Sequence, residues 1–142
     1  MSALGTACAS ASAERGLIDF LPEPLPENNL SPEVTRPPLV SIIIPCYNGA
    51  AYLEEAVLSA LAQSYPAVEV LVVDDGSTDI SPEIAQRFAV RYIRQANRGL
   101  SGARNRGIQE CSGAYVVFLD ADDRLKPRAI ESGFRALKRH PD

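Results

Sequence analysis

The chain has 142 residues, a length suited to one domain with one sizeable core. Its 18 acidic and 14 basic residues give a net charge of −4, which argues against a basic nucleic-acid-binding surface. His140 is the only histidine and lies near the end of the chain, which argues against a Ser-His-Asp triad or a histidine-ligated zinc site.

Residues 1–37 differ in composition from the rest of the chain. Prolines recur from Pro22 to Pro38, with Glu and Asn between them, and this composition opposes regular structure. We predict a flexible Pro-rich leader over 1–37 and a folded domain over 38–142. No apolar run reaches about 18 residues, so we expect no transmembrane segment and a cytoplasmic location. Membrane association through a missing C-terminal part stays open.

Runs of mainly apolar, β-branched residues predict buried strands at 39–44, 68–73, 90–93 and 115–119. Pro45 should end the first strand. Asn48 can then cap a helix that stops before Pro66. Ser81 can cap a second helix, with Pro82 at its first position. The chain therefore alternates strand and helix from its first predicted strand onward.

The second half of the chain continues this alternation. A third helix follows a glycine-rich loop at 97–102, and a last helix begins near Pro127 with Ile130, Phe134 and Leu137 facing inward. Strands that are apolar throughout, with helices between them, predict a parallel sheet with right-handed crossovers. The expected fold class is α/β, Rossmann-like, with a mainly parallel sheet flanked by helices.

Three predicted strands run directly into polar turns, at 45–49, 74–77 and 120–123. Because the carboxyl ends of parallel strands share one edge of the sheet, we expect these turns to converge. There the ring of Tyr47 could lie against a flat base. Asp74 or Asp75 could accept hydrogen bonds from a base or a ribose.

The third of these turns contains three carboxylates within four residues. Like charges so close favour a bound cation, and Asp120 with Asp122 would suit Mg²⁺ or Mn²⁺ bridging a diphosphate. Gly99 and Gly102 would let backbone amides approach phosphate, with Arg104 adding positive potential. Together these features predict a nucleotide-diphosphate site.

Each feature also has a purely structural interpretation. Tyr47 alone is more often a packing residue, 74–77 a tight turn, Arg104 a surface charge and 120–123 a solvated acidic turn. Their occurrence together, at successive strand ends, favours the functional interpretation.

Four motifs, in this order, resemble family 2 glycosyltransferases of the GT-A fold: IIPCYNG at 43–49, VVDDGSTD at 72–79, NRGLSGARN at 97–105 and GAYVVFLDADD at 113–123. The resemblance runs from about Leu39 to the end of the chain. It implies an enzyme that transfers a sugar, with inversion, from a nucleoside-diphosphate sugar to a hydroxyl of an acceptor. The acceptor, whether glycan, lipid or protein, is not readable.

The resemblance also implies roles for individual residues. The nucleotide-sugar-binding residues would be Pro45, Tyr47, Asn48, Asp74, Asp75, Gly99, Arg104 and Asp120. Asp122 would be the main metal ligand, helped by Asp120, and the cofactor would be Mg²⁺ or Mn²⁺.

In that family the general base lies well beyond the metal motif. Glu131 is a poor candidate for it, because its position suits a solvent-facing side of a helix. We therefore expect a partial domain, whose uncovered sheet edge could lead to self-association. A nucleotide-sugar-binding module without turnover is the main alternative. A phosphotransfer domain with a nucleophilic Asp is disfavoured, since no suitable Thr follows the acidic pair and Lys126 is the only nearby lysine.

Overall fold

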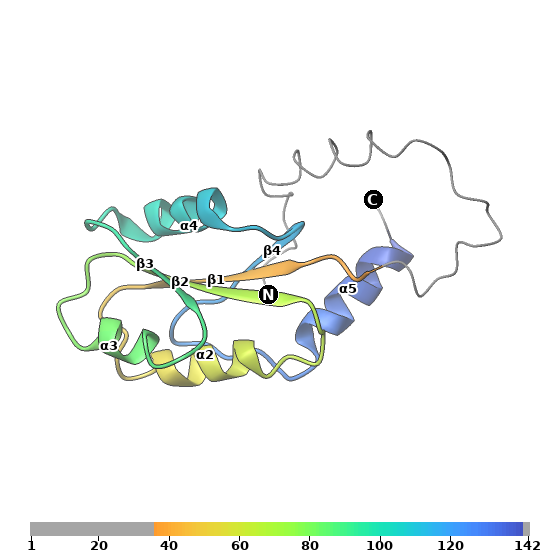
Figure 1. The fold of residues 1–142 in the computed structure, drawn as a ribbon, viewed down its shortest axis with the longest axis horizontal. Helices are drawn as coiled ribbons and strands as arrows, with labels where there is room; N and C mark the ends of the chain where they lie inside the picture. Colours follow the sequence, from red (N-terminus) through yellow and green to blue (C-terminus); the bar gives the residue numbers. More distant parts are fainter. Residues whose placement is uncertain (1–35, 141–142) are drawn as a thin grey trace.

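The computed structural model describes residues 36–140 of the chain. Its strands form one sheet in the order β3-β2-β1-β4, in which all neighbours are parallel (Figure 1). The strands are β1 (Val40–Cys46), β2 (Val68–Asp74), β3 (Arg91–Arg94) and β4 (Tyr115–Phe118). The predicted α/β fold with a parallel sheet is confirmed. The predicted leader at 1–37 lies outside the described residues, apart from its last two positions.

The described helices are α2 (Leu53–Leu61), α3 (Ser81–Ala85), α4 (Gly99–Glu110) and α5 (Ala129–Arg139). Figure 1 shows α4 on one side of the sheet and α2 and α3 on the other. The chain order explains this arrangement. It steps from β1 to β3 in one direction and then returns across the sheet to β4, so a right-handed crossover places α4 on the opposite face. No helix within residues 36–140 combines the length and apolar character needed to cross a membrane.

Successive residues of β1 divide between two cores. Ile42 and Ile44 pack on the side that includes Ile130 of α5, whereas Ile43 packs with Ala103 of α4. All three isoleucines are fully buried. A central strand covered on both faces has no solvent-facing positions, which is why its sequence is apolar almost throughout.

The predicted caps at Asn48 and Ser81 are wrong. Helix α2 begins only at Leu53, and Asn48 has a φ of 50°, in the left-handed region. Its Oδ1 accepts a hydrogen bond from the Thr78 amide at 2.7 Å. The Ser81 hydroxyl, at the start of α3, accepts from the Gly49 amide at 3.0 Å. Both side chains therefore join two loops instead of capping their own helices.

The chain that follows the acidic turn is held by the C-terminal end of α2. Ser59 Oγ accepts a hydrogen bond from the Leu125 amide at 3.0 Å. Gln63 contacts the segment twice, because its Nε2 donates to the Lys126 carbonyl at 2.7 Å and its Oε1 accepts from the Ile130 amide at 2.9 Å. These bonds fix the path of the chain between β4 and α5.

Glu131 strengthens the same attachment. Its carboxylate accepts a hydrogen bond from the Ser64 hydroxyl at 2.6 Å and forms ion pairs with Arg128 at 3.0 Å and Arg135 at 2.8 Å. The bond from Ser64, followed by that from Arg128, lowers the pKa of Glu131 from 4.5 to about 2. A carboxylate with so low a pKa is a weak general base at neutral pH, in agreement with the low expectation for Glu131 in that role.

Gly107 lies where α4 crosses β1, and a Cβ at this position would come within 2.5 Å of Ile43 Cγ2. Gly107→Ala should destabilise the protein by about 1–2 kcal/mol. Overpacking costs about 1–3 kcal/mol, and a Cβ only 2.5 Å from another carbon places the cost at about 2–3 kcal/mol, which outweighs the gain of about 1 kcal/mol in helix propensity. Gly133 on α5 is the matched control, because no atom lies within 4 Å of a Cβ there, and Gly133→Ala should be neutral or stabilising. Chemical denaturation measures both, and equal effects would contradict close packing of α4 on β1.

The contacts of Glu131 should make stability depend on pH in the acid range. The pKa of about 2 in the folded protein lies below the usual 4.5, so the stabilisation is fully present above about pH 4.5 and is lost as the pH falls through about 2. The difference in unfolding free energy between wild type and Glu131→Gln should therefore shrink across this window in urea titrations. Ser64→Ala should narrow this pH range, because it removes the bond that lowers the pKa of Glu131 most. A difference that stays constant over the same pH range would contradict this prediction.

Candidate functional site

The strand order reverses between β1 and β4, because the chain runs from β1 to β3 on one side and then returns to β4 on the other. Open α/β sheets form their ligand crevice at such a point, beyond the carboxyl ends of the strands. A cavity of about 430 Å³ lies there. Its walls come from the end of β1, the loop behind it, α4 and the turn after β4: Pro45, Tyr47, Asn48, Gly49, Tyr52, Leu100, Asp120, Ala121 and Asp122.

Pro45 ends the pairing of β1 with β4. The carbonyl of Ile43 faces β4, where it accepts a hydrogen bond from the Leu119 amide at 2.9 Å. The amide that Pro45 lacks would face the same way, because residues two apart in a strand are equivalent. Pairing with β4 stops at Ile43 and Phe118, whereas pairing with β2 continues to Cys46. The prediction that Pro45 ends the strand is therefore wrong for β1 as a whole but holds for its pairing with β4.

Two aromatic side chains form the rim of the cavity on the β1 side. Tyr47 is 53% exposed and Tyr52 is 56% exposed. Exposed rings beside a cavity can stack on a flat base or on the face of a sugar. Asn48 also lines the cavity, although its Oδ1 is already bonded to the loop after β2.

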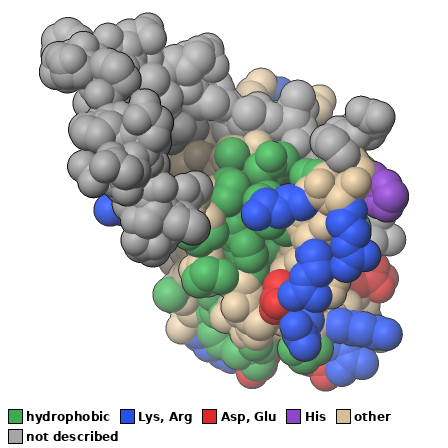
Figure 2. Space-filling view, turned by 90° about the vertical axis from the view of Figure 1, so that its right-hand side faces the viewer, with side chains coloured by type: hydrophobic (Ala, Val, Ile, Leu, Met, Phe, Trp, Pro, Cys, Tyr) green, Lys and Arg blue, Asp and Glu red, His purple; other side chains and the backbone are tan. Residues whose placement is uncertain are grey.

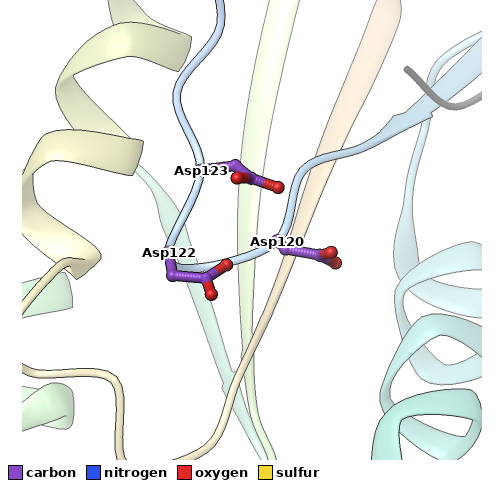
Figure 3. Close-up of side chains that lie close together, drawn as sticks. All are labelled: Asp120, Asp122 and Asp123. Atoms are coloured by element: carbon purple, nitrogen blue, oxygen red, sulfur yellow. The ribbon is translucent and has the colours of Figure 1, made fainter.

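The turn after β4 places three carboxylates together on the opposite rim. Oxygen atoms of Asp120, Asp122 and Asp123 lie within 4.8 Å of one another. Figure 3 shows the three side chains projecting in the same general direction from the turn. The Asp123 amide donates to the Asp120 carbonyl at 2.9 Å, which closes the turn. Three hard oxygen ligands at this spacing fit one divalent cation, and such a cation would offset their mutual repulsion.

Arg104 connects α4 with the acidic turn. Its Nη2 lies 3.2 Å from Asp120 Oδ1, and its guanidinium carbon lies 5.3 Å from the centre of the Phe118 ring. The Nε of Arg104 is buried and has no hydrogen-bond acceptor among the residues that the structure describes. Arg104 does not line the 430 Å³ cavity, but it contacts one of the residues that does.

Asp75 and Gly99 are placed together, below the cavity and not on its wall. The Asp75 side chain is buried and accepts hydrogen bonds from the amides of Arg98 at 2.7 Å and Gly99 at 2.8 Å, and from Gln95 Nε2 at 2.8 Å. Helix α4 begins at Gly99, so the predicted glycine-rich loop is partly the first turn of this helix. Gly99 has a φ of 84°, a conformation that favours glycine. In this structure Asp75 therefore caps α4.

Asp74 also lies outside the cavity wall and joins β2 to its neighbours. Its Oδ1 accepts from the Ser77 amide at 2.8 Å, and its Oδ2 accepts from the Tyr92 hydroxyl at 2.5 Å and from Arg94 Nη1 at 2.8 Å. Burial, together with the bond to this carboxylate, raises the pKa of Tyr92. Asp74 thus shapes the turn after β2, and its part in nucleotide-sugar binding stays a prediction.

Asp79 ties the loop after β2 to the loop after β1. Its Oδ1 accepts from the Ser81 amide at 2.8 Å, and its Oδ2 accepts from the Ala50 amide at 3.1 Å. Burial is the largest single influence on its pKa and acts upward. The hydrogen bonds from Ser81 and Ala50 together outweigh burial and hold the pKa of Asp79 below its usual value. The two loops are therefore fixed by charge-assisted bonds.

The sequence predictions missed several residues of this site. Tyr52 and Leu100 line the cavity because α2 starts later, and α4 earlier, than their sequence patterns indicated. Asp123 belongs to the cluster of carboxylate oxygens, and its position in the acidic turn could have identified it as a further metal ligand. Cys46 at the end of β1 is not a candidate nucleophile, because burial raises the pKa of its thiol.

Comparison with known proteins shows to which family the chain is similar. The family model described as "Glycosyl transferase family 2" matches residues 41–142. The glycosyltransferase GlyA of Streptococcus pneumoniae is 40% identical over 103 residues, which cover 69% of this chain and 15% of GlyA. The chain thus spans a small part of the length of this relative.

Two solved structures are similar to this chain. S. aureus TarS 1-349 in complex with UDP-GlcNAc has a TM-score of 0.68 and 28% identity, over 72% of this chain and 32% of TarS 1-349. The mannosyltransferase PcManGT from Pyrobaculum calidifontis, in complex with GDP-Man and Mn²⁺, has a TM-score of 0.62 and 29% identity, over 88% of this chain and 38% of that protein. With the family model matching 41–142, more than half of its length, the chain belongs to glycosyl transferase family 2.

Proposed function

We propose that this chain is the donor-binding part of a metal-dependent glycosyltransferase. The reaction would move a sugar from a nucleoside diphosphate to an acceptor hydroxyl, with inversion at the sugar carbon. The cavity between β1 and β4 carries this proposal, because it joins exposed aromatic rings on one side to a group of carboxylates on the other. PcManGT, a similar structure, binds GDP-Man and Mn²⁺.

The base and ribose of the donor would lie on the β1 side of the cavity. There Tyr47 supplies an exposed ring, while Pro45 and Asn48 form the wall. Asp74 and Asp75 would act from behind this wall, by fixing the turn after β2 and the start of α4. Rigid support of this kind lowers the entropy cost of binding.

The diphosphate would lie on the β4 side, next to the acidic turn. Asp122 and Asp120 would hold a divalent ion, Mg²⁺ or Mn²⁺, with Asp123 within reach. When bound, such an ion supplies positive charge for the departing diphosphate. Arg104 would orient the Asp120 side chain, through the contact of 3.2 Å.

A nucleotide-sugar-binding module without turnover is the second candidate. An inverting displacement needs a base that takes the proton of the acceptor hydroxyl. Glu131 is a poor general base, because its pKa is low and its carboxylate is already bonded to Ser64, Arg128 and Arg135. Detection of sugar transfer by the 142-residue chain alone would exclude this second candidate.

Calorimetric titration with UDP, GDP and dTDP, with and without Mn²⁺, tests the proposal. At least one nucleotide should bind more tightly with Mn²⁺. Asp122→Asn should reduce this gain by at least about tenfold, because even changes around the first ligands of a metal cost about 10–100-fold in metal affinity. Glu83→Gln, an equal change in charge on the exposed surface of α3, is the control and should leave the gain intact. If no nucleotide shows metal-dependent binding, the proposal is wrong.

Asp75→Asn separates a structural role from a role in nucleoside binding. The substitution weakens the bonds from the amides of Arg98 and Gly99 to a buried carboxylate, so it should cost about 1–3 kcal/mol of stability in chemical denaturation. It should also weaken the binding of uridine or guanosine in the absence of metal, measured at a temperature where the variant is folded. Lower stability with unchanged nucleoside affinity would leave Asp75 a structural role alone.

A further inference from the structure

A second cavity lies on the other side of Asp120. It has a volume of about 880 Å³ and is bounded by β4, the segment after the acidic turn and α5. Asp120 lines both this cavity and the one between β1 and β4. The volume is in the range of small-molecule sites, about 300–1,000 Å³. A molecule in the second cavity would therefore lie directly beside the proposed donor site.

The walls of this cavity are rich in positive charge, unlike the rest of the chain. Four cationic side chains and two carboxylates line it: Arg104, Arg124, Lys126 and Arg128, with Asp120 and Asp123. Residues 124–139 contain six basic residues and one acidic residue, a net charge of +5, whereas the whole chain carries −4 and its remainder therefore −9. Figure 2, which views the molecule from the side of α5, shows Lys and Arg side chains gathered in a band beside an apolar patch.

Several of these charges are incompletely paired within residues 36–140. Arg128 is committed to Glu131 at 3.0 Å, but Arg124 has only a long contact with Glu55, at 3.9 Å. Lys126 has no ion pair with another described residue, and the buried Nε of Arg104 has no acceptor. An anion in the cavity would supply what these donors lack, since hydrogen bonds that involve charged groups are about twice as strong as neutral ones.

We propose that the 880 Å³ cavity binds the acceptor and that this acceptor carries an anionic group, a phosphate or a carboxylate, held by Lys126 and Arg124. This inference rests on the proposed function, because it places the acceptor next to the donor through the shared residue Asp120. The wall of the donor cavity holds two carboxylates, Asp120 and Asp122, and no cationic side chain, so it would repel such an anion. Around the second cavity, four cationic side chains outnumber Asp120 and Asp123. The cationic wall would draw it to the α5 side, which fixes the orientation in which its hydroxyl reaches the donor.

Amide signals of the ¹⁵N-labelled 142-residue chain, titrated without metal, test this inference with three ligands of equal carbon length. Glycerol 3-phosphate and glycerate carry the two candidate anionic groups, and glycerol carries neither. The signals of residues 125–133 should respond to one or both anions and not to glycerol. The anion that binds more tightly identifies the anionic group of the acceptor as a phosphate or a carboxylate. Binding of glycerol as tight as that of the anions would overturn the inference, as would the absence of any binding.

Two variants of equal charge change then locate the site. Lys126→Ala should weaken anion binding by about tenfold, the size expected for one hydrogen bond to a charged group. Arg139→Ala also removes one positive charge from the same segment, but Arg139 lies outside the cavity wall and its loss should leave the affinity unchanged. Equal weakening by both would show diffuse attraction to the basic segment and would overturn the site.

The same samples separate this inference from the proposed function. Lys126→Ala should leave the Mn²⁺-dependent nucleotide affinity within about twofold, since Lys126 does not line the donor cavity. Nucleotide binding without anion binding would overturn the acceptor site and leave the proposed function standing. Anion binding without nucleotide binding would overturn both, because the cavity would then have no donor beside it.

Discussion

The backbone amide that Pro45 lacks determines where the functional edge of this sheet forms. The β1–β4 ladder ends at Ile43 and Phe118, because the next bond on that side would need an N–H at position 45. Beyond this point the segments that follow the two strands diverge, one toward Tyr47 and the other toward Asp120. The aromatic rim and the acidic turn thus face each other across a gap that one missing donor opens.

Buried carboxylates keep the two sides of this gap in place. Asp74 and Asp75 are successive residues, so their side chains point to opposite faces of the sheet. Asp74 bonds to a side chain of the neighbouring strand β3, and Asp75 bonds to an amide at the start of α4. Each accepts at least three hydrogen bonds, which offset the cost of burying its charge. On the far side, Gln63, just beyond the end of α2, holds the segment that leaves the acidic turn. The rim consists of loops, yet every loop is bonded to a neighbouring element.

The sequence was sufficient for the sheet and for the meeting of Tyr47 with Asp120 and Asp122, because both follow from strand patterning and from the shared edge of parallel strands. It was not sufficient where a polar side chain could choose between a local and a distant partner. Asn48 is a good helix cap by propensity, but its oxygen bonds the Thr78 amide, 30 residues away. The hydrogen bonds that the Asp75 carboxylate accepts at the start of α4 were not predictable either, since no local pattern shows that Arg98 and Gly99 lie within its reach.

The order of charges along the chain gives the site its polarity. Residues 120–123 carry three negative charges, and residues 124–139 carry a net +5. Asp122 lines the cavity between β1 and β4, and Asp120 lines both cavities. Arg124, Lys126 and Arg128 line only the 880 Å³ cavity, where they outnumber Asp120 and Asp123, so the positive charge gathers on the α5 side of Asp120. Two anionic substrates brought to one site repel each other at short range. A metal ion on one side of Asp120 and Lys126 on the other would neutralise each anion separately, so both could approach the same carboxylate without competing for one cation.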